Sequence, residues 1–167
     1  MVSRRFLLGG AAAIMATSLP GCVSTKFHSY NGPPVTGIIV NKASRRMYLL
    51  SGNTALRAFD FELGGNPVGP KRIEGDGRTP EGAYIINRRN PNSQYYLSVG
   101  ISYPNAQDLA YAQAMGVSPG GDIFIHGTPR DKRRSPDWTA GCIAVTNREI
   151  EDIYAMVRDG TPVLINA

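Results

Sequence analysis

Three apolar runs separated by polar residues mark the first part of the chain as β-rich. Apolar runs occupy Gly37–Asn41 and Arg46–Ser51, and in a third run, residues 55–63, phenylalanines alternate with acidic residues. Strict alternation buries one face of a strand and exposes the other. Turn-forming residues at 51–54 separate the second run from the third. The pattern therefore predicts three consecutive strands joined as a meander.

Four later apolar stretches also predict strands. Residues 83–89 and 95–101 flank an Asn-Pro-Asn-Ser turn, and a short run covers residues 122–126. A Thr-Pro pair leads into a last strand at residues 163–165. Strands therefore continue to the end of the chain.

Two segments carry the signals of helices. Residues 105–115 begin with an asparagine suited to cap a helix and are followed by a glycine suited to end it. In the second, Thr146 and Glu149 form a T-x-x-E capping box. The residues behind the box repeat at i, i+3, i+4 and i+7, and Gly160 is expected to end the helix. These apolar residues are Ile150, Ile153, Tyr154 and Val157.

The glycine and proline content favours a β-rich fold. The 167 residues include 19 glycines and 12 prolines, and 42% are hydrophobic, which is typical of a globular, turn-rich chain. Residues 64–81 form a loop longer than most connections, which we expect to be a binding loop or more mobile than the strands. We predict one domain, mainly β, with two short helices.

The N-terminal segment has the features of an export signal. Residues 1–21 combine a basic start with an apolar run too short to span a bilayer. The Arg4-Arg5 pair resembles a twin-arginine signal, and the Leu-Pro-Gly-Cys sequence ending at Cys22 resembles a lipobox, although its proline is unusual. The alternative is an ordinary cleaved signal. Residues 22–35 are interpreted as a tether and residues 36–167 as the folded domain.

Net charge limits the classes of partner. The chain carries +5, and cleavage before Cys22 would remove Arg4 and Arg5 and leave +3. Such a charge suits contact with anionic cell-envelope polymers. No basic helix or aromatic stacking motif accompanies it, so we expect no nucleic-acid partner.

Cysteine and histidine supply the candidate chemistry. The two cysteines and two histidines match no zinc-ligand spacing, so no metal is expected. His126 ends a predicted strand and Cys142 lies 16 residues later, directly after Gly141. A thiol beside an imidazole has its thiolate favoured, which predicts a nucleophile and a base, with the N–H groups near Gly141 and Cys142 facing an oxyanion. A small buried cysteine and a structural histidine are the alternative on spacing alone.

Two sequence motifs reproduce a known signature. Ile-His-Gly-Thr-Pro at residues 125–129, followed by Trp-Thr-Ala-Gly-Cys-Ile-Ala at 138–144, resembles the H-G…S/T-x-G-C-I signature of L,D-transpeptidases of the YkuD domain family. Residues 75–82 contain the T-P-x-G element found upstream of it. The resemblance covers residues 36–166. It implies a β-sandwich-like fold, a periplasmic location and action on peptidoglycan stem peptides without a cofactor.

The resemblance also assigns roles to residues. It implies Cys142 as nucleophile, His126 as base, and the Gly127 carbonyl as the group that orients the imidazole. The Thr139 hydroxyl would brace the loop. The implied reaction is attack on the amide after the third stem residue, loss of D-alanine, and transfer of the resulting thioester to an amine.

Ala144 departs from the family pattern, because many members carry arginine after G-C-I. The G-C-I-A-V-T ending is closer to a branch that includes an amidase. Hydrolysis by an L,D-carboxypeptidase or cross-link-cutting amidase is therefore the alternative to transpeptidation, and a non-catalytic wall-binding lipoprotein is a third.

Three further residues are candidates for substrate binding. Arg78 and Arg130, the latter in a basic cluster at 130–134, would pair with an anionic substrate group. A solvated charged loop is the alternative for the cluster. Trp138 would either line the groove or anchor the loop.

Overall fold

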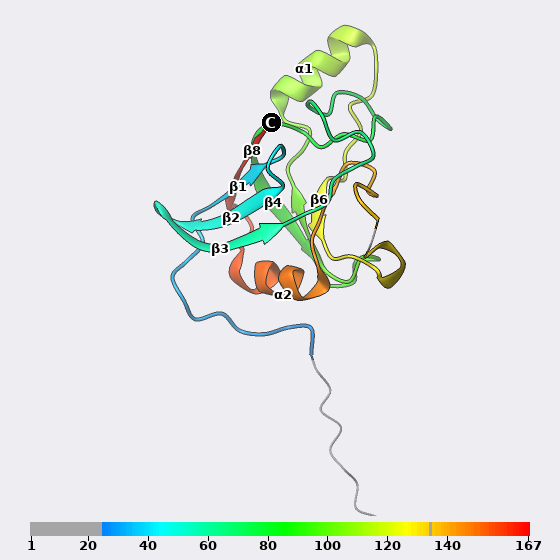
Figure 1. The fold of residues 1–167 in the computed structure, drawn as a ribbon. Coiled ribbons are helices and arrows are strands. Elements are labelled where there is room, and N and C mark those ends of the chain that lie inside the picture. The colour runs from blue at the N-terminus through cyan, green and yellow to red at the C-terminus, as the bar shows by residue number, and fades with distance from the viewer. Residues whose placement is uncertain (1–24, 134) are drawn as a thin grey trace, which may run out of the picture.

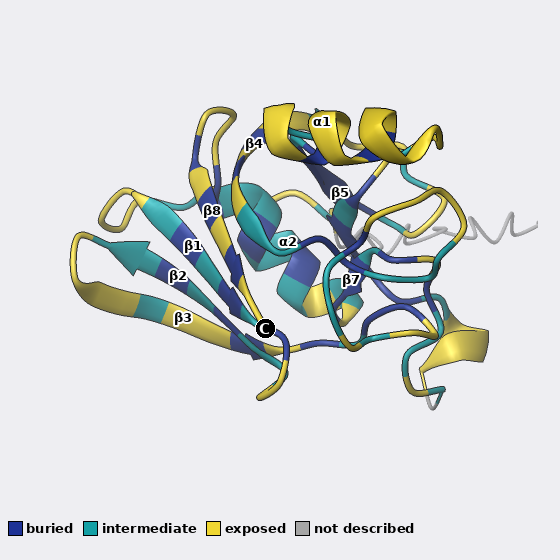
Figure 2. Ribbon diagram, turned by 90° about the horizontal axis from the view of Figure 1, so that it is seen from above, coloured by how far each residue is buried: buried dark blue, intermediate teal, exposed yellow. Residues whose placement is uncertain are grey.

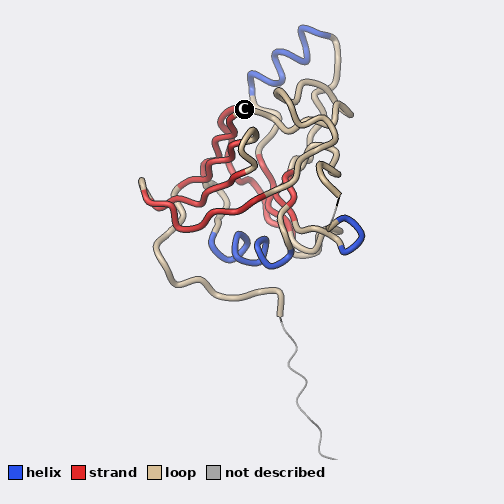
Figure 3. Tube along the Cα trace, in the orientation of Figure 1, coloured by secondary structure: helices blue, strands red, loops and turns tan. Residues whose placement is uncertain are grey.

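The structure, a computed structural model, describes residues 25–133 and 135–167. The expected signal sequence and Cys22 lie outside these residues. The architecture is mainly β with two α-helices, as expected from the sequence (Figures 1 and 3). In chain order the elements are β1 Gly37–Asn41, β2 Arg46–Ser51, β3 Thr54–Asp60, β4 Gly82–Asn90, β5 Ser98–Ile101, α1 Ala106–Met115, β6 Phe124–His126, the 3-10 helix η1 Arg130–Lys132, β7 Ile143–Ala144, α2 Asn147–Met156 and β8 Pro162–Asn166.

The strands form one curled sheet in the order β3-β2-β1-β8-β4-β5-β6-β7. The first three strands are the expected antiparallel meander, and β8 lies between β1 and β4, parallel to β1 (Figure 1). β4 pairs with β8 through its first half and with β5 through its second, with a register shift between Ile86 and Arg88. Such a bulge bends a strand. β4 therefore joins the two halves of the sheet.

Helix α2 supports the strand that ends at His126. Ile150, Ile153 and Met156 are buried, and α2 contacts β5 and β6. The capping box is confirmed, because the Thr146 hydroxyl accepts from the Glu149 N–H and the Glu149 carboxylate accepts from the Thr146 N–H. The helix ends at Met156, before the expected Gly160.

Helix α1 has the expected ends. Asn105 caps it by accepting from two backbone N–H groups, and Gly116 ends it in the left-handed conformation, with φ 65°. Only Asp108 and Ala112 of this helix are buried, and Figure 2 shows most of α1 exposed. It covers little of the core.

Three strands are shorter than the sequence predicts. β3 stops at Asp60 because Glu62 instead exchanges backbone hydrogen bonds with Ala144, at 2.8 and 2.9 Å. Positive φ angles at Tyr96 and Asp122 precede β5 and β6. Non-glycine residues rarely extend a strand in that conformation. The segment after β3 therefore runs to the edge that carries the candidate site.

Residues 25–35, the described part of the expected tether, contain no helix or strand and lie beside α2 (Figure 1). The Phe27 ring lies 6.0 Å from that of Tyr154, and His28 Nε2 lies 3.1 Å from the Asp152 carboxylate. This part of the segment thus contacts the folded domain.

Candidate active site

The structure brings Cys142 and His126 to the same place. His126 ends β6, Cys142 directly precedes β7, and these strands pair in parallel with Ile125 opposite Ile143. Both side chains line two adjoining cavities, of about 410 Å³ and about 360 Å³. Tyr95 also lines both. The segment between His126 and Cys142, which contains η1, therefore folds back and brings the two residues together.

His126 is held in one tautomer. The residue is 2% exposed, and its Nδ1 lies 2.7 Å from the Gly127 carbonyl oxygen. A carbonyl only accepts hydrogen bonds, so Nδ1 carries the proton and Nε2 is the basic nitrogen. Burial lowers the pKa of His126, and the bond to Gly127 opposes this effect. The imidazole is neutral at pH 7.

The Cys142 sulfur contacts the segment before β6 and is largely buried. Its Sγ lies 3.5 Å from the Asp122 carbonyl oxygen and 3.4 Å from the Phe124 amide nitrogen. Burial raises the pKa of the Cys142 thiol above its ordinary value; the Phe124 N–H and the Lys71 charge lower it, and the Asp122 charge raises it. Burial thus opposes the thiolate that the sequence predicts, because it disfavours the charged forms of both side chains.

The raised pKa of the Cys142 thiol predicts slow alkylation of this residue. At pH 7 iodoacetamide should modify Cys142 more slowly than a free cysteine peptide, and the rate should rise until the pH exceeds the raised pKa. Mass spectrometry of the peptide containing Cys142 separates its labelling from that of Cys22. A rapid, pH-independent reaction between pH 6 and 8 would contradict the raised pKa.

Thr139 braces the loop that carries Cys142. Its hydroxyl donates to the Cys142 carbonyl at 2.8 Å and accepts from the Gly141 N–H at 3.1 Å. The Gly141 amide is thus occupied, which corrects the expectation that it faces an oxyanion. Among the described residues the Cys142 N–H has no hydrogen-bond partner, so it is the amide left for that role.

The loop at residues 64–81 packs behind Cys142. The Thr79 hydroxyl, fully buried, donates to the Gly141 carbonyl at 2.7 Å. Gly141 has φ 125°, and a Cβ there would lie 2.4 Å from the Arg78 carbonyl oxygen. Only glycine fits this contact without strain. The upstream T-P-x-G element is therefore in direct contact with the G-C element.

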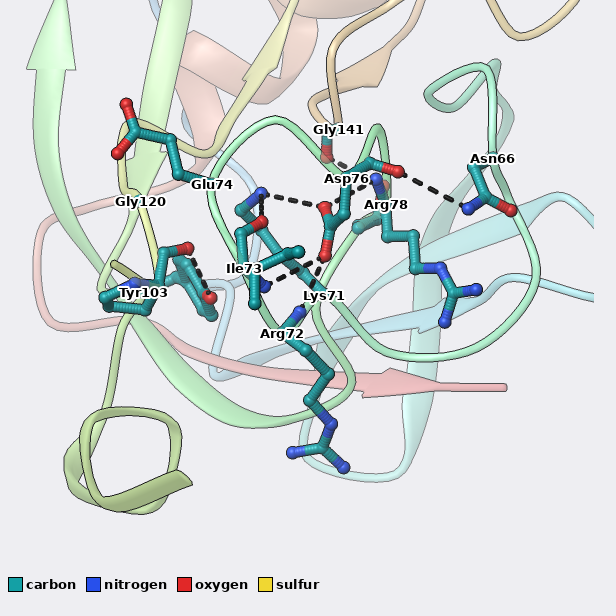
Figure 4. Close-up of polar contacts among 12 residues, drawn as sticks. Asn66, Lys71, Arg72, Ile73, Glu74, Asp76, Arg78, Tyr103, Gly120 and Gly141 are labelled. Atoms are coloured by element: carbon teal, nitrogen blue, oxygen red, sulfur yellow. Dashed lines mark hydrogen bonds and ion pairs between the residues drawn. The ribbon is translucent and has the colours of Figure 1, made fainter. Parts of the chain in front are cut away.

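The Asp76 carboxylate connects several residues of this loop through hydrogen bonds (Figure 4). Its carboxylate accepts from the N–H groups of Arg72, Ile73 and Arg78 at 2.8–3.1 Å and from the Lys71 ammonium at 3.0 Å. Lys71 is 3% exposed. We call these five residues the Asp76 cluster. Its hydrogen bonds oppose the expectation that the loop is more mobile than the strands.

The remaining candidates divide into two groups. Trp138 and Thr139 line the 360 Å³ cavity with Cys142. Arg78 and Arg130 line neither cavity. The Arg78 guanidinium extends away from Gly141 (Figure 4). Of the basic cluster at residues 130–134, Lys132 rather than Arg130 lines the 360 Å³ cavity.

Sequence reasoning missed Tyr95 and Asp122. The Tyr95 ring stacks on His126, and the Asp122 carbonyl lies beside the thiol. No spacing links Tyr95 to the signature, although an aromatic residue next to a Pro-Asn turn is a weak signal of a binding loop. Asp122 acts through its backbone, which leaves no side-chain pattern to find.

No group of three or more metal-ligating side chains occurs among the described residues. In the same part of the chain, no helix is long and apolar enough to cross a membrane.

Comparison with known proteins decides the family. The model of the YkuD L,D-transpeptidase catalytic domain matches residues 36–165. The chain belongs to the YkuD family. The match contains every described strand and helix apart from Asn166, the last residue of β8.

Individual relatives agree with this assignment. "Putative L,D-transpeptidase YafK" of Escherichia coli is 35% identical over 92 residues, covering 54% of this chain and 32% of YafK. The helical cell shape determining protein Pgp2 of Campylobacter jejuni has a TM-score of 0.63 and 29% identity, covering 81% of this chain and 49% of Pgp2. An L,D-transpeptidase of Mycobacterium smegmatis, 14% identical with a TM-score of 0.52, covers 78% of this chain and 58% of its own and shares the fold. The chain thus spans about a third to half of YafK and Pgp2.

Proposed function

We propose that this YkuD domain is a cysteine acyltransferase that acts on peptidoglycan stem peptides. The observation that carries the proposal is that Cys142 lines the same two cavities as a buried His126, whose Nδ1 is fixed by the Gly127 carbonyl. Two cavities that meet at one thiol suit a reaction with two substrates. Membership of the L,D-transpeptidase family supports a peptidoglycan substrate.

The proposed reaction begins from the neutral pair. As substrate approaches, His126 Nε2 takes the Cys142 proton, and the sulfur attacks the carbonyl carbon of the amide after the third stem residue. The Cys142 N–H donates to the oxyanion. The C–N bond then breaks, the imidazolium protonates the leaving amine of D-alanine, and a thioester remains. An acceptor amine attacks the thioester carbonyl carbon and gives a proton to His126. The C–S bond then breaks, and the imidazolium returns a proton to the sulfur, which restores the thiol.

Hydrolysis is the second candidate, and it needs the same residues. Water in place of the amine would release a shortened stem or a cut cross-link. Ala144 is the feature that favours it: this residue is 1% exposed and pairs with His126, where many family members carry arginine. We further propose that the chain is exported, with attachment to the membrane through a lipid on Cys22 or release after signal cleavage.

Mass spectrometry tests the proposal directly. The full chain and Cys142→Ala are incubated with purified tetrapeptide muropeptides and with cross-linked wall fragments. The proposal expects loss of D-alanine together with new cross-linked dimers, and neither product with Cys142→Ala. An acyl-enzyme mass trapped on Cys142 would identify the thioester.

Other products lead to other conclusions. Tripeptides or released cross-links without dimers would establish hydrolysis. If neither chain forms any product while a known L,D-transpeptidase is active in the same assay, the acyltransferase proposal fails and a wall-binding role replaces it.

A further inference from the structure

The Tyr95 ring lies against the imidazole of His126. The two ring centroids are 4.4 Å apart and the planes differ by 24°, which is a stacked arrangement. Tyr95 belongs to the connection between β4 and β5, far from the signature in sequence. Stacking of this kind is directional, because it constrains the plane of the second ring as well as its position.

The Tyr95 backbone also supports the group that orients His126. The Gly127 N–H is shared between the Tyr95 carbonyl at 3.1 Å and the Leu97 carbonyl at 3.2 Å, while the Gly127 carbonyl accepts from His126 Nδ1 at 2.7 Å. A Cβ on Gly127 would lie 2.8 Å from the Tyr95 carbonyl oxygen, so the two segments are in close contact. One residue therefore touches the imidazole directly and also fixes its hydrogen-bond acceptor.

The imidazole needs this second constraint. A single hydrogen bond at Nδ1 fixes one atom but permits rotation of the ring, which would move Nε2 away from the thiol. Trp138 meets the imidazole edge-on, with centroids 5.5 Å apart and planes at 63°. An edge contact limits the ring on one side only. The flat face of the imidazole is held by Tyr95.

We propose that Tyr95 is a positioning residue, which holds the His126 imidazole in the plane needed to take the Cys142 proton and covers it from water. It lines both cavities that contain the thiol. Tyr95 is 39% exposed as a residue, so part of it meets solvent while its ring contacts His126. The expected effect on kcat rests on the proposed function. The expected effect on the His126 titration does not depend on it.

Loss of the ring should change the titration of His126. Burial lowers the pKa of His126, so removing a covering ring should return it toward the ordinary value of about 6.5. Two nearby carboxylates have cationic partners: Asp122 lies 2.6 Å from Arg88, and Asp131 lies 3.7 Å from Lys132. The titratable and charged groups that line the two cavities around the imidazole are Cys142, Tyr95, Asp122, Asp131 and Lys132.

The test compares Tyr95→Ala and Tyr95→Phe with the matched control Tyr111→Ala. Tyr111 is 41% exposed on α1 and stacks on the Arg72 guanidinium, so its loss removes a ring of similar exposure outside the site. NMR titration of labelled imidazoles in the full chain reports His126 without substrate, and His28→Gln assigns the second of its two histidines.

We expect Tyr95→Ala to raise the midpoint of the His126 titration and to lower kcat about 10–100-fold, with a smaller change in KM. The acid limb of the pH–rate profile should shift to higher pH together with the midpoint of the His126 titration. Tyr95→Phe keeps the stacked ring, so its His126 titration midpoint and its kcat should stay near the wild-type values. Tyr111→Ala should change neither quantity. If Tyr95→Ala does not fold, Tyr95→Leu, which keeps apolar bulk without a flat ring, should still lower kcat, with a smaller change in the His126 titration.

Two results would overturn the proposal. An unchanged His126 titration in Tyr95→Ala, with only KM raised, would make Tyr95 a substrate contact. A Tyr95→Phe variant as impaired as Tyr95→Ala would assign the effect to the hydroxyl. If the wild-type chain turns over no muropeptide, the proposed function fails, whereas the NMR titration still decides whether Tyr95 covers the imidazole.

Discussion

Replacing Asp76 with alanine is expected to lower the free energy of unfolding by about 3–5 kcal/mol. The change would leave the Lys71 ammonium, in a residue 3% exposed, without the carboxylate that lies 3.0 Å away. It would also remove the acceptor from the N–H groups of Arg72, Ile73 and Arg78. Urea unfolding followed by the fluorescence of the single tryptophan measures the loss.

An exposed ion pair of the same chain supplies the control. Arg46 and Asp60 lie 2.7 Å apart, but the Asp60 side chain is 78% exposed. Asp60→Ala should cost less than about 1 kcal/mol. Adding Lys71→Met to Asp76→Ala should recover part of the loss, since no buried charge is then left unpaired. Equal costs for the Asp76 and Asp60 variants would show that the Asp76 cluster does not hold the loop.

The same carboxylate should make stability depend on pH in acid. Burial raises the pKa of Asp76, but the hydrogen bonds from Arg72, Arg78, Lys71 and Ile73 together lower it below its ordinary value. A lowered folded-state pKa contributes stability that is complete above the unfolded value of about 3.9 and is lost as the pH falls through the folded value. The stability difference between wild type and Asp76→Ala should therefore narrow below about pH 4.

Local chemistry is the part of the fold that the sequence predicts well. The capping box of Thr146 and Glu149 involves atoms three residues apart, and the apolar runs of β1 and β2 can be recognised without knowledge of their partners. The placement of β8 between β1 and β4 depends on pairs such as Ile38 with Val163 and Gly82 with Ile165, which lie far apart in sequence and which no local pattern encodes. The early end of β3 has the same cause, because Glu62 pairs with Ala144.

The candidate site shows the same division. The signature motifs identify Cys142, His126 and Gly127 as candidates, since these residue types recur at fixed spacing. Their protonation states also depend on burial, which raises the pKa of the Cys142 thiol and which the motif does not encode. The glycines and prolines of residues 64–81 indicate a mobile loop from composition alone. Composition does not show that the Asp76 carboxylate holds this loop through its hydrogen bonds.

Replacing Gly141 with alanine is expected to lower kcat about 100-fold or more. The new Cβ would lie 2.4 Å from the Arg78 carbonyl oxygen, and φ 125° is strained for any residue with a side chain. Relief of either conflict moves the loop that carries Cys142, because Thr79 and Thr139 both bind the Gly141 peptide units. Muropeptide turnover by mass spectrometry measures the change, and the free energy of unfolding should fall by about 2–4 kcal/mol.

Gly116→Ala separates backbone strain from the contact with Arg78. Gly116 also has a positive φ, 65°, but a Cβ there meets nothing within 4 Å. This variant should lose about 1–2 kcal/mol of stability and keep its activity. If Gly141→Ala retains a kcat within a few-fold of wild type, the loop adapts to the added carbon, and the close packing of the two motifs is not what positions the nucleophile. A stable but inactive Gly141→Ala would mean that the contact between residues 78 and 141 positions Cys142, since Gly116→Ala carries a positive-φ strain without that contact.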